Sequence, residues 1–197
     1  MKRSLESSKK NGTVFLQGDK VYLRGLNKKD FHGPYFDWLN DPKVTRYLQS
    51  GLFPNSKEKM RDNYKQYVSG NGQLFLAIID KKNKKHIGNI KLGPINWVHR
   101  FSEFGILIGE KKYWGKGFGY EATRLLLDHA FDKLNIHRIR LGVVDENKSA
   151  IRSYLKLGFK IEGKAREQFF IDGKYRDVIY MGVLEDEYRK QGMKKKK

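Results

Sequence analysis

Apolar and polar residues alternate with a period of two in several short runs of the chain, and this pattern is typical of strands. Strands are therefore predicted over residues 21–26, 74–79, 86–92, 101–108, 138–144, 160–171 and 175–184. The second, third and fourth of these runs follow one another closely, which predicts an antiparallel meander. Asp172 and Gly173 are typical hairpin residues, and they join the last two predicted strands.

Apolar residues recur every three or four positions in other segments, as they do on one face of a helix. Helices are predicted over residues 28–39, 55–68, 122–134 and 147–156. Asp41 and Pro42 are expected to stop the first helix. Asn55, with Glu58 three residues later, is expected to cap the second, and Gly158 closes the last.

The order of these elements predicts one domain, because no internal repeat and no shift in composition marks a linker. We expect a polar, basic lead-in over residues 1–19, a domain over 20–184 and a basic tail over 185–197. The fold class is α/β (α+β). Its sheet is expected to be mixed and mostly antiparallel, with about seven strands and about four flanking helices.

Residue composition removes several kinds of chemistry. The 197 residues include no Cys, which excludes disulfides, thiolate zinc sites, iron–sulfur clusters and a cysteine nucleophile. The histidines show no metal-ligand spacing, so we expect no metal. No run approaches the roughly 18 apolar residues of a membrane span, and no apolar region follows the charged N-terminus. The sequence thus predicts a cytoplasmic protein without a membrane partner, and it leaves a homodimer open.

The formal net charge is +19, of which residues 1–10 carry +3 and residues 186–197 carry +4. The remaining +12 belongs to the body of the protein, which is therefore expected to attract phosphates or other anions. A basic nucleic-acid-binding module is an alternative reading. The sequence has no zinc-finger, basic-zipper or RNA-binding strand motif to support this alternative, so no specific nucleic acid is expected as a partner.

A strand is followed by three alternating glycines and then by a helix. Gly115, Gly117 and Gly119 let the backbone approach a ligand closely, and the helix start adds unpaired N–H groups. This combination is typical of a diphosphate site. The spacing fits neither a nucleotide-hydrolase loop nor a dinucleotide fingerprint. A glycine-rich turn without a ligand is the other reading.

The next strand-to-helix junction carries two further candidates. Asn147 is a natural N-cap that could bond an extended amide arm. Tyr154 lies two turns further along the helix, from where its hydroxyl could donate a proton into the same cleft. A half-buried aromatic residue without a chemical role is the alternative for Tyr154.

Together these segments resemble the GNAT superfamily of N-acetyltransferases, over about residues 20–184. Residues 114–119 occupy the place of the family's phosphate loop, with Trp114 where a polar residue is usual. The helix motif Asn-x-x-Ala-x-x-x-Tyr-x-x-x-Gly-Phe is matched in full over residues 147–159. The subfamily resembled most contains ribosomal-protein N-terminal, spermidine and amino-sugar-nucleotide acetyltransferases.

The resemblance implies a splayed sheet, with the pantetheine arm of acetyl-CoA running along residues 104–108 as a pseudo-strand. It also implies direct attack of a primary amine on the thioester in a ternary complex. The acceptor is then a small molecule, such as an amino-sugar nucleotide, or a peptide N-terminus. A domain that binds acyl-CoA without catalysis remains a further alternative.

The candidate residues follow from this reading. Tyr154 is the expected acid and Glu103 the expected base, although a solvated charge at the strand end is an equally simple explanation of Glu103. Trp38 and His99 are candidates for the acceptor side, with core packing or a surface role as their alternatives. The expected cofactor contacts are Ile106, Leu107, Ile108, Trp114, Gly115, Lys116, Gly117, Phe118, Gly119 and Asn147. The basic body favours an anionic or neutral acceptor over a polycation.

Overall fold

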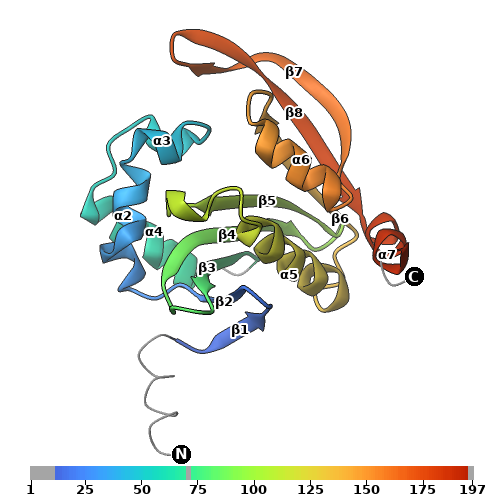
Figure 1. Ribbon diagram of the computed structural model, residues 1–197, viewed down its shortest axis with the longest axis horizontal. Helices are drawn as coiled ribbons and strands as arrows, with labels where there is room; N and C mark the ends of the chain where they lie inside the picture. The colour runs from blue at the N-terminus through green and yellow to red at the C-terminus, as the bar shows by residue number, and fades with distance from the viewer. Residues whose placement is uncertain (1–11, 70–71, 195–197) are drawn as a thin grey trace, which may run out of the picture.

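The computed structural model describes residues 12–69 and 72–194, which form an open eight-stranded sheet with helices on both faces (Figure 1). The sheet order is β1-β2-β3-β4-β5-β6-β8-β7. The strands are β1 (Val14–Gln17), β2 (Val21–Gly25), β3 (Leu74–Asp80), β4 (His86–Asn96), β5 (Phe101–Ile108), β6 (Arg138–Val144), β7 (Lys160–Ile171) and β8 (Lys174–Leu184). The basic runs at the two ends of the chain lie largely outside the described residues.

Six α-helices and three short 3-10 turns complete the described part of the chain. The helices are α2 (Pro34–Leu39), α3 (Pro42–Thr45), α4 (Lys57–Ser69), α5 (Phe118–Asp132), α6 (Lys148–Lys156) and α7 (Glu185–Lys194). The turns are η1 (Asp30–His32), η2 (Gln49–Gly51) and η3 (Lys111–Tyr113). The predicted mixed α/β class and the meander of β3, β4 and β5 are confirmed.

The sheet divides between β5 and β6. These two strands are parallel, and their register pairs only Phe101–Glu103 with Arg138–Arg140. Beyond Glu103 no further pairing of described residues joins the two strands, and they diverge toward their carboxyl ends (Figure 1). Both edges remain paired outward, β5 with β4 and β6 with β8. The sheet is therefore splayed, as the family resemblance implies.

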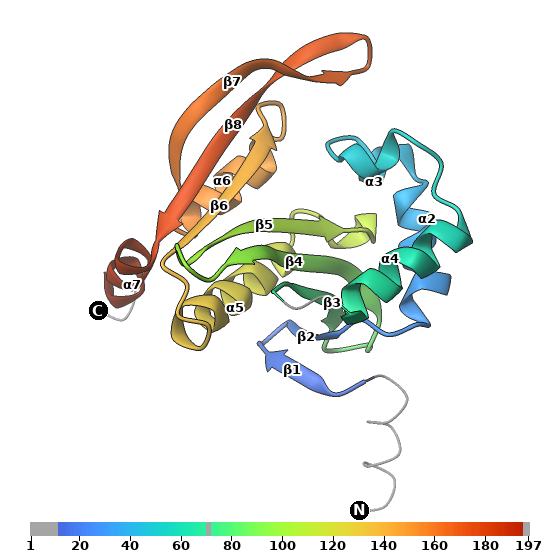
Figure 2. The same cartoon turned by 180° about the vertical axis from the view of Figure 1, so that it is seen from behind.

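Two apolar clusters lie on opposite faces of the sheet. Alternate residues of β5, Phe104, Ile106 and Ile108, join the main core, to which α5 and α6 contribute. Leu107 points to the other face, where Phe31 and Met60 from the segment before β3 cover it. Figure 2 shows α2 and α4 on that face, opposite α5. The period of two in β5 thus assigns each side chain to one of two environments.

Several predicted elements differ in detail. The predicted helix over 28–39 is divided into η1 and α2 at Gly33, because Pro34 lacks an N–H and occupies the first turn of α2. Asp41 does not merely end a helix, since its side chain caps α3. The cap of α4 is Ser56, whose Oγ accepts from the Lys59 N–H at 3.1 Å.

Asn55 has a different role from the predicted cap. Its side-chain amide is buried and donates to the Leu39 carbonyl at 3.1 Å and the Ser50 carbonyl at 2.8 Å, which fastens the loop after α2. An Asx followed by a Glu three residues later is compatible with both roles. The long-range contact to Leu39 decides between them.

The strand and helix counts also exceed the expected seven and four. The short strand β1 lies within the predicted lead-in and pairs with β2. In the predicted tail, α7 packs on α5, where the Tyr188 hydroxyl donates to Asp128 at 2.7 Å and the ring lies 5.2 Å from that of Phe131. Tyr188 therefore fixes a segment whose sequence is mostly charged.

A buried ion pair joins β2 to the helical segment that follows it. Arg24 donates two hydrogen bonds to Asp30, at 2.7 and 2.8 Å, and both side chains are about 6 % exposed. Burial raises the pKa of Asp30, but hydrogen bonds from Arg24 and from the Asn27 N–H outweigh it and hold the pKa below its ordinary value. The ionised carboxylate thus stabilises the fold above its unfolded pKa of about 3.9, and this contribution is lost as the pH falls through the lower folded value.

We predict that Asp30→Asn lowers the free energy of unfolding by about 3–5 kcal/mol, because it leaves the Arg24 guanidinium buried without its charged partner. Denaturant unfolding followed by circular dichroism measures this difference. The control is Asp62→Asn, whose pair with Lys65 is exposed and contributes at most about 1 kcal/mol. Equal losses in the two variants would contradict the assignment.

Candidate functional site

The glycine loop between β5 and α5 has the conformation that its sequence requires. Gly115 and Gly117 have φ angles of +70° and +83°, a region that side chains rarely adopt. Gly117 is the N-cap of α5, and no side chain caps this helix end. The first N–H groups of the helix therefore face outward with the positive end of its dipole. This arrangement can hold a diphosphate.

One local and two long-range contacts fix the loop and the start of α5. The Trp114 indole donates to the Ile108 carbonyl at 2.7 Å, so this residue closes the turn after β5. The Lys20 ammonium donates to the Lys116 carbonyl at 3.0 Å. Glu121, buried in the first turn of α5, accepts from the backbone N–H groups of Asp19 and Lys20. The β1–β2 turn is thereby held against the start of α5.

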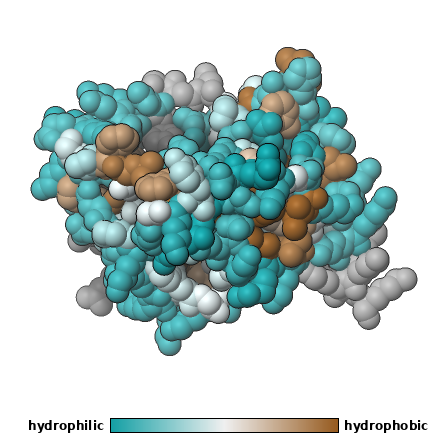
Figure 3. All heavy atoms as spheres, turned by 90° about the horizontal axis from the view of Figure 1, so that it is seen from above, coloured by the Kyte–Doolittle hydropathy of each residue, from teal (hydrophilic) through white to brown (hydrophobic). Residues whose placement is uncertain are grey.

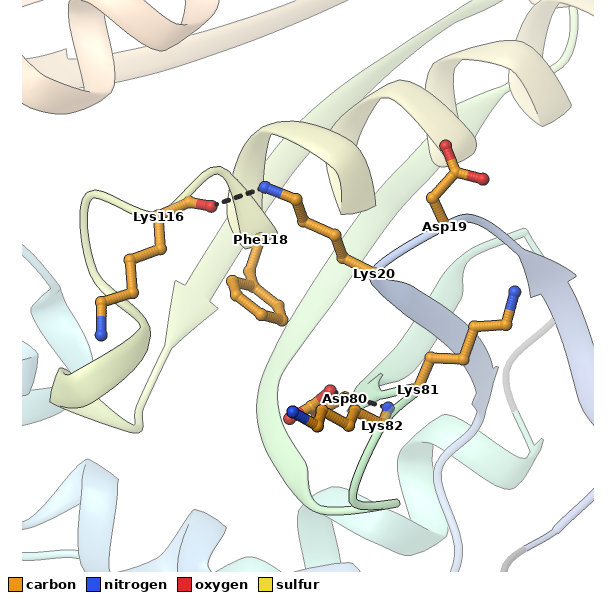
Figure 4. Close-up of a pocket in the computed structure, with 7 residues that line it drawn as sticks. All are labelled: Asp19, Lys20, Asp80, Lys81, Lys82, Lys116 and Phe118. Carbon is orange, nitrogen blue, oxygen red and sulfur yellow. Dashed lines mark hydrogen bonds between the residues drawn. The ribbon is translucent and has the colours of Figure 1, made fainter.

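A pocket of about 470 Å³ lies beside this loop (Figure 4). The Lys20 side chain extends over the ring of Phe118 toward the loop, while Asp80 ends β3 and Lys82 lies in the turn after it. The lining residues are Asp19, Lys20, Asp80, Lys81, Lys82, Lys116 and Phe118. The Asp80 carboxylate accepts from the Tyr113 hydroxyl at 2.8 Å. Four ammonium groups against two carboxylates make the pocket suited to phosphates.

The edge of β5 that faces β6 is free of strand partners from Phe104 onward, within the described part of the chain. Ile106, Leu107 and Ile108 pair with β4 on their other edge. An extended chain that carries amides can therefore add to β5 as a further strand. The Ile108 carbonyl is already engaged by Trp114, which sets the end of this edge next to the loop.

Across the gap, α6 presents Asn147 and Tyr154. The Asn147 side-chain oxygen accepts from the Ala150 N–H at 3.2 Å, which confirms its predicted position as N-cap. Its amide nitrogen donates to no described residue. The half-buried Tyr154 ring packs edge-on against Phe104, with centroids 5.9 Å apart, and also contacts Phe159.

Burial raises the pKa of the Tyr154 hydroxyl to about 12. The hydroxyl has no hydrogen-bond partner among the described residues, so a donor is left available on the α6 side of the gap. At neutral pH the group is fully protonated. It can therefore donate a hydrogen bond or a proton but cannot act as a base.

Glu103 lies where β5 and β6 separate. Its Oε1 accepts from Arg140 at 2.8 Å, and Arg140 stacks over the ring of Phe101 with its guanidinium carbon 4.9 Å from the centroid. The Glu103 side chain is 54 % exposed. Residues of β5 alternate between faces, so Glu103 and Tyr154 lie on opposite sides of the sheet.

The two acceptor candidates lie apart. Trp38 is 5 % exposed, and its ring fills the space over Gly109, where an added Cβ would come within 1.9 Å of it. Its indole also packs edge-on against His86, with centroids 5.0 Å apart. His99 is exposed in the turn between β4 and β5, and its N–H donates to Asn96 at 2.8 Å. Trp38 thus packs in the interior, as in the alternative that the sequence offered for it, core packing.

Sequence reasoning did not find the contact that spans the open end of the gap. Arg46, after α3, lies 3.0 Å from Asp172 at the tip of the β7–β8 hairpin and 3.7 Å from Glu146 in the turn between β6 and α6. Glu146 also pairs with Arg176 at 2.8 Å. Arg46 is far from both carboxylates in the sequence, and no local pattern connects them.

The described part of the chain contains no cluster of metal ligands and no membrane-spanning helix. No three histidine or acidic side chains there lie close enough to share a metal ion. None of the described helices is both long and apolar enough to span a bilayer.

Comparisons with known proteins agree with this geometry. Residues 20–160 match the acetyltransferase (GNAT) domain family. Spermidine N(1)-acetyltransferase of Escherichia coli K12 is 34 % identical over 169 residues, covering 85 % of this chain and 88 % of that one. The Vibrio cholerae enzyme of the same name is 32 % identical over 172 residues, covering 87 % and 91 %. The crystal structure of spermidine N-acetyltransferase from V. cholerae with CoA and spermine aligns with a TM-score of 0.80, at 31 % identity, covering 87 % of this chain and 99 % of that one.

We predict that Gly117→Val abolishes measurable binding of acetyl-CoA in calorimetry. The added side chain blocks close approach to the loop amides and strains a backbone with positive φ. The matched control is Gly173→Val, which introduces the same strain at φ +78° in the β7–β8 hairpin turn. Wild-type affinity in Gly117→Val, or equal losses in both variants, would refute the diphosphate site.

Proposed function

This chain belongs to the GNAT acetyltransferase family, and on that premise we propose that it transfers the acetyl group of acetyl-CoA to a primary amine of a polyamine. The observation that carries acetyl transfer is the unpaired edge of β5, which ends at an uncapped helix N-terminus with a glycine loop. One ligand that carries both an amide arm and a diphosphate satisfies both features. The pocket lysines support the phosphate end.

In the proposed reaction the free amine attacks the thioester carbonyl carbon. The new C–N bond forms, the C–S bond breaks, and the electron pair leaves on sulfur as CoA thiolate. One proton leaves the amine nitrogen and one is taken up by sulfur, so the overall proton count is unchanged. Direct attack needs both substrates in place together, because bound geometry replaces a bimolecular encounter.

Tyr154 is proposed to stabilise the departing thiolate. A hydroxyl with a pKa of about 12 is a weaker acid than an ordinary thiol, whose pKa is about 8.5. Complete transfer of its proton to sulfur is therefore unfavourable, and a hydrogen bond to the developing negative charge is the favoured contribution. Solvent then supplies the proton to the free thiolate.

Glu103 is proposed as the group that accepts the amine proton, directly or through water. Arg140 occupies Oε1, while Oε2 accepts no hydrogen bond from the described residues. The carboxylate lies on the face of the sheet opposite Tyr154. An amine that arrives on the Glu103 face would attack the thioester with Glu103 on its own side and the Tyr154 hydroxyl on the far side. The base would then lie beside the amine and the hydrogen-bond donor beside the departing sulfur, as the reaction requires.

The relatives named spermidine N(1)-acetyltransferase support a polyamine as acceptor. Two carboxylates at the open end of the gap, Glu146 and Asp172, support it as well, because a polyamine that replaces the exposed Arg46 would keep both of them paired. A buried Glu146 oxygen and a buried Asp145 oxygen accept no hydrogen bond from the described residues. Carboxylates of this kind suit the second ammonium of a polyamine.

A second candidate acceptor is an anionic amine, such as an amino-sugar nucleotide. The observation in its favour is the charge of +12 on the body of the chain, which raises the local concentration of anions. Figure 3 shows that the surface seen from above is mostly hydrophilic, with separate apolar groups to the left and right. Such a surface suits a polar acceptor of either sign.

We predict that Tyr154→Phe lowers kcat by about 10² or more and leaves the affinity for acetyl-CoA nearly unchanged, because only the hydroxyl is removed. Steady-state kinetics and calorimetry on the same preparations separate the two effects. The substitution preserves the packing of α6 on β5, since the ring that contacts Phe104 remains. Undiminished turnover would exclude the role of the hydroxyl.

We predict saturable release of CoA thiol with spermidine or spermine, and weaker activity with an amino-sugar nucleotide or a peptide N-terminus. The double variant Glu146→Gln, Asp172→Asn should raise KM for spermidine about tenfold or more and leave KM for a simple monoamine unchanged, because only the polyamine has a second ammonium. Asp62→Asn serves as a distant control. Turnover of sugar nucleotides without any turnover of polyamines would favour the second candidate.

A further inference from the structure

The α6 side of the gap between β5 and β6 is filled. Phe104 contacts Tyr154 and Phe159 there, with ring centroids 5.9 and 6.3 Å away, and all three rings belong to the main core or pack on it. An acceptor of any size cannot reach the edge of β5 through these rings. The opposite face of β5 is therefore the side from which an amine approaches.

On that opposite face β5 presents Glu103, Gly105 and Leu107 in alternation. Leu107 is covered by the second apolar cluster, around Phe31. Gly105 is uncovered, since a Cβ built on it would have no atom within 4 Å. Lys91 is the register partner of Gly105 on β4, and its side chain does not come within 4 Å of the Cβ position either.

Neither packing nor backbone conformation requires glycine at position 105. Two other glycines near strand ends do have a packing reason, because a Cβ on Gly88 would lie 2.2 Å from the Leu107 carbonyl and one on Gly109 would meet Trp38. Gly105 has no such neighbour, and its φ lies outside the left-handed region. A glycine inside a strand weakens the strand, and Gly163 in β7 shows that an open position alone does not mark a ligand site. What distinguishes Gly105 is its place, because it opens onto the acceptor face of the gap beside Glu103.

We propose that Gly105 determines the size of the group that can accompany an amine to the thioester. The inference rests on the proposed function, in that the acetyl-CoA arm lies along the edge of β5. A side chain at position 105 would project onto the acceptor face beside Glu103 and would leave the backbone groups of β5 unchanged. It would therefore obstruct bulky amines while sparing both small amines and the cofactor.

The test compares two amines that are both neutral at pH 7, hydroxylamine and the bulkier O-benzylhydroxylamine. Protein-dependent release of CoA thiol from acetyl-CoA is measured for the wild type, Gly105→Val and Gly163→Val. Gly163 in β7 is the matched control, because its Cβ would also meet nothing within 4 Å and it lies away from the gap. Valine is favoured in strands, so both variants are compatible with the fold.

Gly105→Val is expected to reduce the rate with O-benzylhydroxylamine about tenfold or more and the rate with hydroxylamine by no more than about twofold. Calorimetry should give wild-type affinity for acetyl-CoA. Unchanged rates with both amines, or equal losses with both, would overturn the proposal while leaving acetyl transfer intact. A wild type that turns over spermidine but accelerates neither of these reactions would also overturn the size proposal. A wild type that binds acetyl-CoA but releases no CoA thiol with spermidine or with either hydroxylamine would overturn the proposed function itself. Gly105→Ala provides a smaller step if the valine variant does not fold.

Discussion

The separation of β5 from β6 after three residue pairs is the constraint on which the rest of the structure depends. An interior strand edge without partners leaves backbone N–H and C=O groups unsatisfied, and such groups are costly when they are buried. Here the edge is open on one face and closed on the other. The core continues beneath the gap through Tyr154, Leu157 and Phe159, so the divided sheet still rests on one apolar layer. The gap is therefore an opening to which the proposed extended ligand would add as a further strand.

The two parts of the sheet beside this opening are held by polar contacts of different kinds. On the β5 side, Glu121 and Lys20 connect the β1–β2 turn to the glycine loop. Across the open end, Arg46 connects the helical segment to Asp172 and Glu146, through side chains that are 28 to 70 % exposed. Exposed ion pairs contribute little stability and are easily exchanged. The loop is thus fixed, whereas the open end can exchange Arg46 for another cation.

Most strands and the tight turn of the glycine loop could be predicted from the sequence, because they depend on neighbours within a few residues. The pattern of β6 and the N-cap role of Asn147 are of this kind. The positions of Glu121 and Trp38 are not, since their partners lie about 100 and 70 residues away. Strand β1 was missed because only one of its four residues is partly buried. Without a buried face, its apolar and polar residues have no reason to alternate. The Asn55 cap was misassigned because two caps of similar sequence compete and a tertiary contact selects between them.

The proposed polyamine acceptor and a chain of charge +19 are compatible once the range of electrostatic interactions is considered. The Debye length at physiological ionic strength is about 8 Å, so charges beyond that distance are largely screened at the surface. The pocket lysines come from the β1–β2 turn, the turn after β3 and the glycine loop, whereas Glu146 and Asp172 come from the turn after β6 and the β7–β8 hairpin. The pocket beside the glycine loop is basic, and the open end of the gap has carboxylates whose present partners are arginines. A polycation that displaces Arg46 would keep these carboxylates paired, so the local arrangement, rather than the net charge, decides which acceptor the site can hold.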